Sequence, residues 1–525
     1  MSDSVDFSGR PFHFIGIGGI GMSALAYILV KRKLPVSGSD LRLTHITQKL
    51  QDLGAHIFWN QEATNLEYFQ ATANLTEALP APTEVSGSSN GSRSHGTLNG
   101  AVDGSKPKAK PNLKSQASLL PQVICSTAIG VNNPEYRAAL DLGCPIFHRS
   151  DVLAALIREH HSIAVAGTHG KTTTSSLIGY LLMESGLDPT IVVGGEVDAW
   201  GGNARMGESP YLVAEADESD GSLVKFESAI GVITNIELDH PDHYHSLEQL
   251  TQTFQKFASQ CQIVVGCMDC QGVQNLKPQM TYSLNGESGA DYIADKVVYG
   301  PAGTTARIWE RHEVLGQLTL PLLGKHNLSN ALAAIAVGRL LDLDFPVIAR
   351  AISTFQGAHR RFEHRGEANR ILFVDDYAHH PSEIEVTLAA AQLHIQGKLT
   401  GVDQRRVVAI FQPHRYSRTQ TFLAEFAQSF KDADLVVVTD IYSAGEANSG
   451  NLTGQQVADA IAAYHGEVYF QPSLNSVSAF LNEVLQAGDL ALFLGAGNLN
   501  QIIPDVLAYQ RNLENSLPQK WCNQA

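Results

Sequence analysis

The sequence predicts an α/β protein built from three successive domains, and three observations support this fold class. An apolar segment at Phe12–Ile17 leads into a glycine-rich turn and then into a helical pattern of apolar residues. The same order of strand, glycine turn and helix recurs between residues 162 and 186. Four apolar runs after residue 355 each give way to polar or glycine residues, as the strands of an open parallel sheet do. Because 525 residues exceed what one core can organise, we expect domains at residues 1–157, 158–354 and 355–525.

The first glycine-rich turn has the spacing of a nucleotide-binding motif. Its glycines are Gly16, Gly18, Gly19 and Gly21. Asp40 ends the next strand about twenty residues on, where a dinucleotide fold places the carboxylate that binds a ribose. Backbone N–H groups at such a helix start favour a phosphate. An NAD-type cofactor and a UDP-sugar both fit this pattern, and so does a tight packing turn with no ligand.

The first domain also contains a segment with almost no apolar residues, Ser86–Ser118. It is rich in Gly, Ser, Asn, Lys and Pro, so it cannot bury enough surface to offset the entropy of ordering. We therefore predict a disordered surface insertion.

The second glycine turn is the strongest functional signal in the chain. Its two glycines would let backbone N–H groups approach phosphate oxygens. Lys171 would reach the β- and γ-phosphates, and the Thr172 hydroxyl would ligate Mg²⁺. Val165 stands where the usual pattern has its first glycine, so an ordinary strand-to-helix turn is the alternative. We predict that ATP or GTP binds to a loop made of Gly167, Thr168, His169, Gly170, Lys171, Thr172 and Thr173.

Acidic and histidine residues follow the next two predicted strands. Glu215 ends the first of them, where such folds hold the Mg²⁺ of a bound nucleotide, and we choose it as a metal ligand. We interpret the acids at residues 217–220 as a solvated turn. His240, His243 and His245 follow the second strand. One histidine that assists Mg²⁺ is favoured over a transition-metal site for all three.

Two further groups in the central domain have a functional and a structural interpretation. Cys267 and Cys270 form a lone CxxC pair, for which two small buried residues are favoured over zinc binding. Several polar residues stand at the start of a predicted alanine-rich helix. They could cap the helix or face a ligand. They include His326, Asn327 and Asn330.

The third domain places polar loops after its four strand-like runs, at residues 375–381, 412–418, 440–446 and 495–498. Since ligands bind outside the carboxyl ends of parallel strands, these loops should share one crevice. Its arginines, histidines and carboxylates suit an amino acid or a carboxylate substrate. After about Ala508 the chain turns polar, and we predict a loose tail.

The composition describes an ordinary globular protein, with 44% hydrophobic and 17% charged residues. A net charge of −16 argues against a general binder of nucleic acids or of anionic membranes. No apolar run approaches the ~18 residues of a membrane span, and the amino terminus lacks a secretory core. Six cysteines make no disulfide framework, which predicts a reducing cytoplasm.

Seven motifs together resemble those of the Mur ligases, over nearly the whole chain. They are HFIGIGGIGMSALA from His13, GTHGKTTT from Gly167, AEADESD from Ala214, TNIELDHPDHY from Thr234, GKHNLSNALAA from Gly324, DDYAHHPSEI from Asp375 and QPHRYSRT from Gln412. The chain departs from the family pattern at Ser86–Ser118, at a short loop of residues 397–404, and at Ala378, where glycine is usual.

The resemblance implies a fold and a reaction. The three domains would be a Rossmann-like UDP-binding domain, a central P-loop ATPase domain and a C-terminal Rossmann-like ligand domain. The enzyme would use ATP and Mg²⁺ to join L-alanine to the carboxylate of UDP-N-acetylmuramate through an acyl phosphate, for peptidoglycan synthesis. We expect a monomer or a homodimer with no nucleic-acid or membrane partner.

The resemblance also implies roles for particular residues. The catalytic residues would be Lys171, His379 and Arg415, with His379 or solvent accepting the amine proton. The metal ligands would be Thr172, Glu215 and His240. Residues Tyr377, His379, Arg415 and Arg418 would bind the amino acid and the muramoyl group. His326, Asn327 and Asn330 would lie near ATP, and Gly16, Gly18, Gly19, Gly21 and Asp40 would bind the UDP-sugar. Lys225 is predicted to be an unmodified lysine.

Three rival functions remain open from the sequence. One is a recycling ligase that attaches a tripeptide to the same nucleotide sugar. Another is an NAD-dependent oxidoreductase that uses the first glycine motif, which would leave the second motif without a role. The third is a nucleotide-gated binding protein that hydrolyses ATP without ligating anything.

Overall fold

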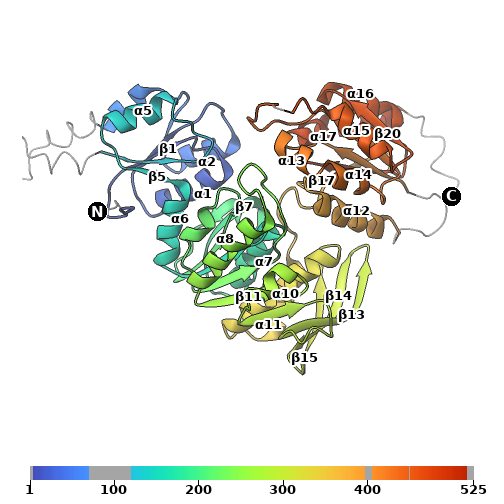
Figure 1. Cartoon of the computed structure of the whole chain (residues 1–525), viewed down its shortest axis with the longest axis horizontal. Coiled ribbons are helices and arrows are strands. Elements are labelled where there is room, and N and C mark those ends of the chain that lie inside the picture. Colours follow the sequence, from blue (N-terminus) through green and yellow to red (C-terminus); the bar gives the residue numbers. More distant parts are fainter. Residues whose placement is uncertain (1–3, 70–119, 397–404, 449, 517–525) are drawn as a thin grey trace, which may run out of the picture. The chain divides into compact units, whose positions relative to one another are not determined.

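The computed structural model describes residues 4–69, 120–396, 405–448 and 450–516. It divides into two compact units, Met1–Val152 and Leu153–Ala525 (Figure 1). The predicted insertion Ser86–Ser118 and the loop at residues 397–404 both lie outside the described residues. The first unit is built on a parallel sheet, and the second unit has two mainly parallel sheets that also contain antiparallel strands.

The first unit contains a five-stranded parallel sheet of order β3-β2-β1-β4-β5. Its strands are β1 (Phe12–Ile15), β2 (Val36–Ser39), β3 (His56–Phe58), β4 (Gln122–Cys125) and β5 (Ile146–His148). Its helices are α1 (Ile20–Lys31), α2 (His45–Asp52), the 3-10 helix η1 (Ala63–Leu66) and α5 (Pro134–Asp141), and α6 (Arg149–Arg158) follows. Because every strand of this sheet points the same way, the loops after β1, β2 and β4 meet at one edge.

A polar cluster lies inside this apolar unit. His13 of β1 and Glu135 of α5 are both fully buried, with Nε2 of the histidine 2.7 Å from Oε1 of the glutamate. The other ring nitrogen of His13 bonds the Ser37 hydroxyl at 2.8 Å, and Asn65 and Ser39 donate to the Glu135 carboxylate. Every polar atom of the histidine and the carboxylate is therefore paired, as burial demands.

The second unit begins with a central domain that has a ten-stranded sheet of order β15-β14-β13-β12-β11-β10-β6-β9-β7-β8. Its strands are β6 (His161–Ala166), β7 (Thr190–Val197), β8 (Gly202–Arg205), β9 (Tyr211–Glu215), β10 (Ile230–Ile233), β11 (Ile263–Cys267), β12 (Met280–Ser283), β13 (Tyr292–Gly300), β14 (Gly303–Glu310) and β15 (Glu313–Leu320). Its α-helices are α7 (Lys171–Glu184), α8 (Leu247–Gln260), α9 (Gln271–Gln274), α10 (Lys325–Leu340) and α11 (Phe345–Thr354). Helices α7 and α10 pack together in one apolar core, where the small alanines of α10 are buried.

The C-terminal domain has a six-stranded sheet of order β16-β17-β21-β18-β19-β20. Its strands are β16 (Glu363–Ala368), β17 (Ile371–Asp376), β18 (Val407–Phe411), β19 (Leu435–Thr439), β20 (Val468–Gln471) and β21 (Leu490–Leu494). Its α-helices are α12 (Pro381–Gln396), α13 (Tyr416–Thr421), α14 (Leu423–Gln428), α15 (Gly454–Ala462), α16 (Leu474–Val484) and α17 (Ile503–Ser516). The four strands predicted here are present as the parallel neighbours β17, β21, β18 and β19, so their carboxyl ends share one edge.

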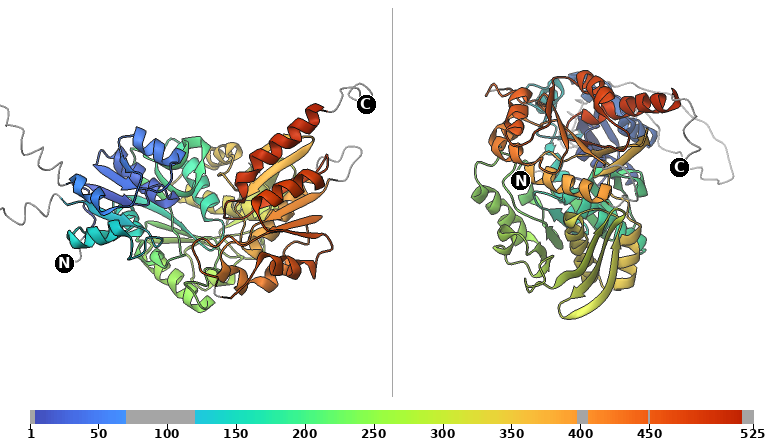
Figure 2. Two further views of the ribbon diagram at one scale, coloured as in Figure 1. Left: turned by 90° about the horizontal axis from the view of Figure 1, so that it is seen from above. Right: turned by 90° about the vertical axis from the view of Figure 1, so that its right-hand side faces the viewer.

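The prediction of a loose tail after Ala508 is wrong as far as Ser516, because α17 continues to that residue. This helix packs against β16, and Figure 2 (left) shows the two side by side. Its polar residues hold the turn between β16 and β17: Gln510 accepts a hydrogen bond from the Asn369 side chain at 3.1 Å, and Glu514 accepts one from the Asn369 amide at 3.0 Å. Their polarity reflects these contacts.

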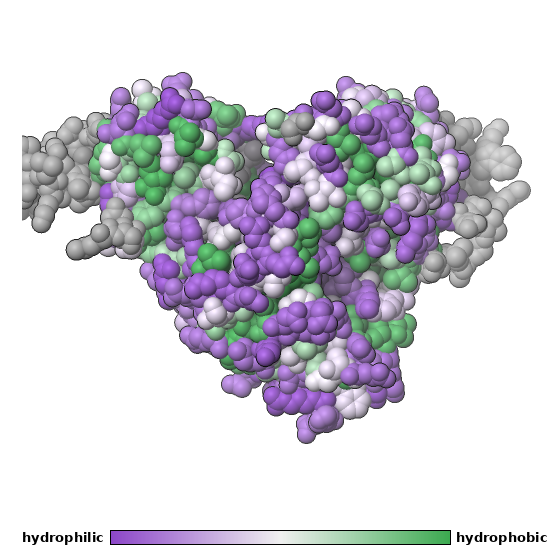
Figure 3. Space-filling model, viewed as in Figure 1, coloured by the Kyte–Doolittle hydropathy of each residue, from purple (hydrophilic) through white to green (hydrophobic). Residues whose placement is uncertain are grey.

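Hydrophilic residues cover most of the face seen in Figure 3, and hydrophobic ones form small groups among them. None of the helices in the described part of the chain is long and apolar enough to cross a membrane.

Candidate functional site

The second glycine motif forms a tight loop between β6 and α7. Gly167 and Gly170 have φ angles of 137° and 81°. A Cβ at Gly167 would lie 1.9 Å from the Thr234 hydroxyl, and one at Gly170 would lie 2.7 Å from the Asn330 side chain. Both glycines are therefore required by close approach as well as by backbone conformation. The loop can bring its backbone amides close to a phosphate.

Lys171 is held inside this loop. Its ammonium group donates to the carbonyls of Gly167 at 2.7 Å and Thr168 at 3.0 Å, and to the Glu218 carboxylate at 2.8 Å. Burial alone would lower the pKa of Lys171, but Glu218 and the neighbouring acids outweigh it and raise the pKa. Glu218 is fully buried, so the interpretation of residues 217–220 as a solvated turn is wrong for this residue.

Two of the three predicted metal ligands lie in contact. The Thr172 hydroxyl donates to Oε1 of Glu215 at 3.1 Å, and the Gly194 amide donates to Oε2 at 2.7 Å. Burial raises the pKa of Glu215. His240 contacts other acids, with Nε2 lying 3.5 Å from Glu218 and 3.6 Å from Asp239. Glu218 thus links the predicted ligand His240 to Lys171.

The other histidines of the loop after β10 and the cysteine pair of this domain contact neighbouring groups of the fold. His243 and His245 are exposed, and His243 lies edge-on to the Tyr244 ring. The Cys270 thiol accepts a hydrogen bond from the Ile236 amide at 3.3 Å, and the Cys267 thiol lies 3.8 Å from the Ser329 hydroxyl. Both thiols are free, and each contacts groups of the fold.

A cavity of about 220 Å³ lies beside the loop of residues 167–173, called the phosphate loop below. The cavity lies between the central and C-terminal domains of the second unit. The loop residues His169, Gly170 and Thr173 line one wall. His326, Asn327 and Asn330, from the start of α10, line another. Burial lowers the pKa of His326 to about 4, and the Arg361 charge acts in the same direction, so the ring is neutral at pH 7. Six of the predicted nucleotide-binding residues therefore meet at one cavity.

The cavity also exposes residues that the sequence prediction missed. Arg361 lies 3.5 Å from the Thr172 hydroxyl and stacks over the Tyr377 ring at 5.1 Å. Asp376 accepts hydrogen bonds from the amides of Phe362 at 2.7 Å and Ala378 at 2.8 Å, and burial raises its pKa to about 6. The position of Asp376 at the carboxyl end of β17 was a usable signal. Nothing local in the sequence marks Arg361.

The two arginines predicted to bind substrate are paired with acids of the central domain. Arg418 forms a fork with Asp239, from Nε to Oδ1 at 2.8 Å and from Nη2 to Oδ2 at 3.2 Å. Burial alone would raise the pKa of Asp239, but Arg418 outweighs it and holds the pKa well below its usual value. Arg415 donates to Asp242 at 2.8 Å and to Glu446 at 3.2 Å.

Tyr377 and His379 follow β17 in the C-terminal domain, and their rings lie edge to face. The Tyr377 ring also lies under Arg360, at 4.9 Å. His379 Nδ1 lies 2.9 Å from the Tyr377 carbonyl and 3.1 Å from Glu383. Burial lowers the pKa of His379 although Glu383 opposes this, so the ring is uncharged at neutral pH and can accept a proton.

The first glycine motif is found in the other unit, between β1 and α1. Gly16 has a φ of 80°, and the Gly19 amide closes the turn on the Gly16 carbonyl at 3.2 Å. The Gly18 amide donates to Asp40 at 2.8 Å. The acid predicted to meet a ribose therefore contacts the glycine turn itself, and Gly21 lies in the first turn of α1.

Comparison with known proteins identifies the family of this chain. Three sequence families match successive parts of the chain: "Mur ligase family, catalytic domain" over residues 11–161, "Mur ligase middle domain" over 165–338, and "Mur ligase, glutamate ligase domain" over 360–497. The chain is 62% identical to a UDP-N-acetylmuramate–L-alanine ligase of Trichodesmium erythraeum, over 97% of this chain and 98% of that protein. It is 61% identical to the protein of the same name from Nostoc punctiforme, over 97% and 98%.

Solved structures agree with the sequence comparison. A UDP-N-acetylmuramate–alanine ligase from Thermotoga maritima superposes with a TM-score of 0.72 and 27% identity, over 97% of this chain and all of that one. A murein peptide ligase from Psychrobacter arcticus shares the fold, with a TM-score of 0.64 and 22% identity over 96% and 99%. With three matching domains in order and more than 60% identity to curated members, the chain belongs to the Mur ligase family.

Proposed function

We propose that this protein joins L-alanine to the carboxylate of UDP-N-acetylmuramate at the expense of ATP, in the synthesis of peptidoglycan precursors. The full-length identity to curated ligases of that name supports the substrates. The observation that carries the proposal is the cavity at the phosphate loop. It lies in the same compact unit as His379, Arg415 and Arg418 of the C-terminal domain.

ATP would occupy this cavity, with its phosphates on the loop. The amides after Gly167 and the positive end of α7 favour phosphate oxygens. The neutral ring of His326 and the amide of Asn330 suit an uncharged base, and Asp376 suits the ribose hydroxyls. Lys171 would leave Glu218 to reach the β- and γ-phosphates.

The oxygen-rich surroundings of Thr172 and Glu215 fit Mg²⁺, which prefers a hydroxyl, carboxylates and water as ligands. Glu218, buried beside Lys171, adds a further carboxylate, and His240 would complete the set from the next loop. When bound, Mg²⁺ supplies positive charge that offsets the charge developing on the transferred phosphoryl group.

The chemistry explains why the site needs these residues. A carboxylate is a poor electrophile at neutral pH, so its oxygen would first attack the γ-phosphate of ATP, forming an acyl phosphate and releasing ADP. Lys171 would stabilise the charge that builds up on the phosphoryl group. Arg361, which lies beside Thr172, is placed to share this task.

In the second step the amine of alanine would attack the acyl carbon, and phosphate would leave. The uncharged His379 is suited to accept the proton from the amine. Arg415 offers a guanidinium fork that matches the alanine carboxylate, in place of Asp242. Arg418 and Tyr377 would contact the muramoyl part of the substrate.

The first unit would bind the UDP-sugar through the glycine turn after β1, at the carboxyl end of its parallel sheet. The free thiols described for this chain fit our proposal of a cytoplasmic location. We also retain the expectation of a monomer or a homodimer, which size-exclusion chromatography with light scattering will decide.

Substrate-dependent release of phosphate from ATP tests the proposed function. With UDP-N-acetylmuramate present, we expect release with a single amino acid, and most with alanine among alanine, serine and glycine. Release with the tripeptide alone would instead identify a recycling ligase. No release in any mixture, from protein shown to be folded, would overturn the ligase function and return the first glycine motif to the NAD hypothesis.

A further inference from the structure

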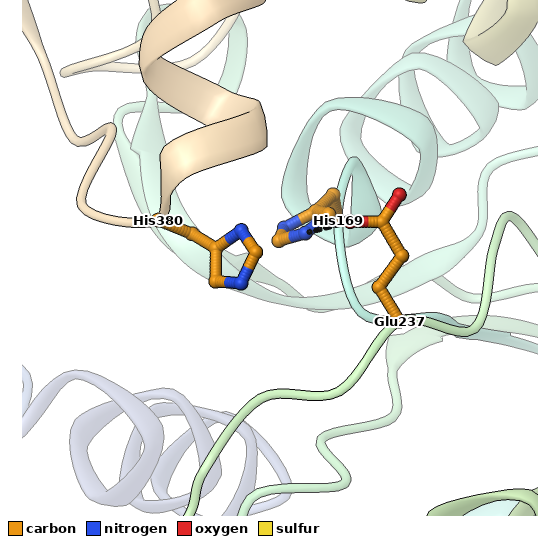
Figure 4. Close-up of side chains that lie close together, drawn as sticks. All are labelled: His169, Glu237 and His380. Atoms are coloured by element: carbon orange, nitrogen blue, oxygen red, sulfur yellow. Dashed lines mark ion pairs between the residues drawn. The ribbon is translucent and has the colours of Figure 1, made fainter. Parts of the chain in front are cut away.

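Three side chains from separate segments form a compact group beside the cavity (Figure 4). His169 belongs to the phosphate loop, Glu237 follows β10, and His380 immediately precedes α12. One ligand atom from each lies within 4.8 Å of the other two. In the described part of the chain, this is the one group of three or more His, Cys, Asp or Glu side chains with such spacing.

Two of these side chains are already oriented by further hydrogen bonds. His169 Nδ1 lies 3.1 Å from the Glu383 carboxylate, which leaves Nε2 facing Glu237 at 3.3 Å. The Ser382 hydroxyl donates to Oε2 of Glu237 at 2.9 Å. A carboxylate behind a histidine and a hydroxyl behind a carboxylate are the outer partners that metal ligands commonly have in proteins.

His380 is the third side chain, and its Nε2 is buried without a hydrogen-bond partner among the described residues. The residue is only 5% exposed, and its ring centre lies 4.7 Å from that of His169. A buried ring nitrogen without a partner is energetically unfavourable, and a ligand at this atom would supply that partner. The Ser382 backbone amide lies 3.4 Å from Nδ1 of His380. Ligation through Nε2 would put the ring proton on Nδ1, so this long contact would be lost.

The protonation states of the two histidines differ. Burial lowers the pKa of His380 to about 4, so its ring is neutral and able to ligate at pH 7. Burial would also lower the pKa of His169, but Glu237 and Glu383 outweigh it and raise the pKa to about 10. An incoming cation must therefore displace the proton of His169, and its affinity should rise with pH.

A cation can reach the group, because His169, Glu237, Ser382 and Glu383 all line the cavity. Two imidazoles and one carboxylate suit Zn²⁺ or Co²⁺, whereas Mg²⁺ prefers oxygen ligands. A tetrahedral site with bonds of about 2.0 Å places its ligand atoms ~3.3 Å apart, so small side-chain rotations would bring the group into range.

We propose that His169, Glu237 and His380 form a binding site for a divalent transition metal of the Zn²⁺ class, which ties the start of α12 to the phosphate loop. The ligands come from the central and the C-terminal domain, so a bound ion cross-links the two. The site is separate from the proposed Mg²⁺ ligands Thr172, Glu215 and His240.

Titration of the full-length protein with Co²⁺, without nucleotide or Mg²⁺, tests the site directly. We expect visible ligand-field absorption that saturates at one equivalent, and a higher thermal midpoint, because a ligand that binds only the folded state stabilises it. Glu237→Gln and His380→Asn should each weaken binding at least tenfold. His245→Asn removes an exposed histidine and should bind as the wild type does, as should Glu215→Gln. Binding should weaken from pH 8 to pH 6.

Three results would overturn the proposal: no absorption in the wild type, absorption that persists in both Glu237→Gln and His380→Asn, or absorption that is lost in Glu215→Gln. The last result would place the ion at the nucleotide-linked site. Should His380→Asn fail to fold, Glu237→Gln decides the matter, because its side chain is 45% exposed and tolerates substitution. None of these measurements depends on ligase activity.

Discussion

Arg418 and Asp239, 179 residues apart, form a forked ion pair that joins α13 to the loop after β10. Their side chains are 2% and 5% exposed. Two charges so deeply buried depend on each other, because neither can be hydrated if its partner is lost. The pair therefore acts as a link between the central and C-terminal domains.

Asp239→Asn should lower the stability of the second unit by about 3–5 kcal/mol, since it leaves the Arg418 guanidinium buried without a counter-charge. Urea denaturation followed by circular dichroism measures this change. The partly exposed pair of Arg307 and Asp295 provides the control, and Asp295→Asn should change the midpoint little. Equal midpoints for Asp239→Asn and wild type would show that the pair does not link the domains.

Lys171→Met should reduce substrate-dependent phosphate release at least a hundredfold, because it removes the charge that we propose to face the transferred phosphoryl group. It should also lower the thermal midpoint, since Glu218 is left buried without its partner. Adding Glu218→Gln should restore the midpoint but not the activity. Recovery of activity in the double variant would show that Lys171 takes no part in the catalytic step.

The stability of the second unit should fall as the pH drops from 6.5 towards 4. His326 has a folded pKa of about 4, below the value near 6.5 of an unfolded histidine, so the unfolded state binds more protons across this interval. The contribution of the neutral His326 ring to the free energy of unfolding is complete above pH 6.5 and is lost as the pH falls towards 4. Thermal midpoints of His326→Asn should therefore depend less on pH than those of the wild type, with exposed His245→Asn as the control. If the thermal midpoints of His326→Asn and of the wild type changed equally with pH, His326 would not be a buried neutral ring.

Glu135→Ala should destabilise the first unit by about 3 kcal/mol, because His13, Ser39 and Asn65 all lose a buried partner. Because the chain divides into two compact units, calorimetry should show one transition lowered and the other unchanged. The exposed Glu67 supplies the control, and Glu67→Ala should alter neither transition. A uniform shift of both transitions would mean that the units unfold together.

The sequence predicted best those elements whose signal is local. The apolar runs of β17, β18, β19 and β21 and the glycine turns before α1 and α7 were all found, because burial on both faces and close backbone approach restrict the residues allowed there. The antiparallel strands β13–β15 were not predicted, since their exposed residues weaken the apolar pattern.

Site residues were missed where their role depends on contacts distant in sequence. Glu218 resembles a solvated turn until Lys171 is placed 2.8 Å away, and Arg361 has no motif of its own but meets Thr172 across 189 residues. Arg415 and Arg418 were found through the family motif, yet their pairing with Asp242 and Asp239 could not be read from it. The spacing of glycines in the sequence predicts a loop that binds phosphate, whereas only the fold shows which acids surround that loop.

The bond between Lys171 and Glu218 changes how nucleotide affinity should respond to salt. A phosphate that approaches a free lysine gains a new ion pair, which salt screens strongly. Here a bound phosphate would displace a carboxylate that already pairs with the ammonium group, so one anion would be exchanged for another. The Lys171–Glu218 pair would thereby disfavour adventitious anions, and much of the selectivity that we expect for a nucleotide would come from the backbone amides around Gly167 and Gly170 rather than from the charge of Lys171.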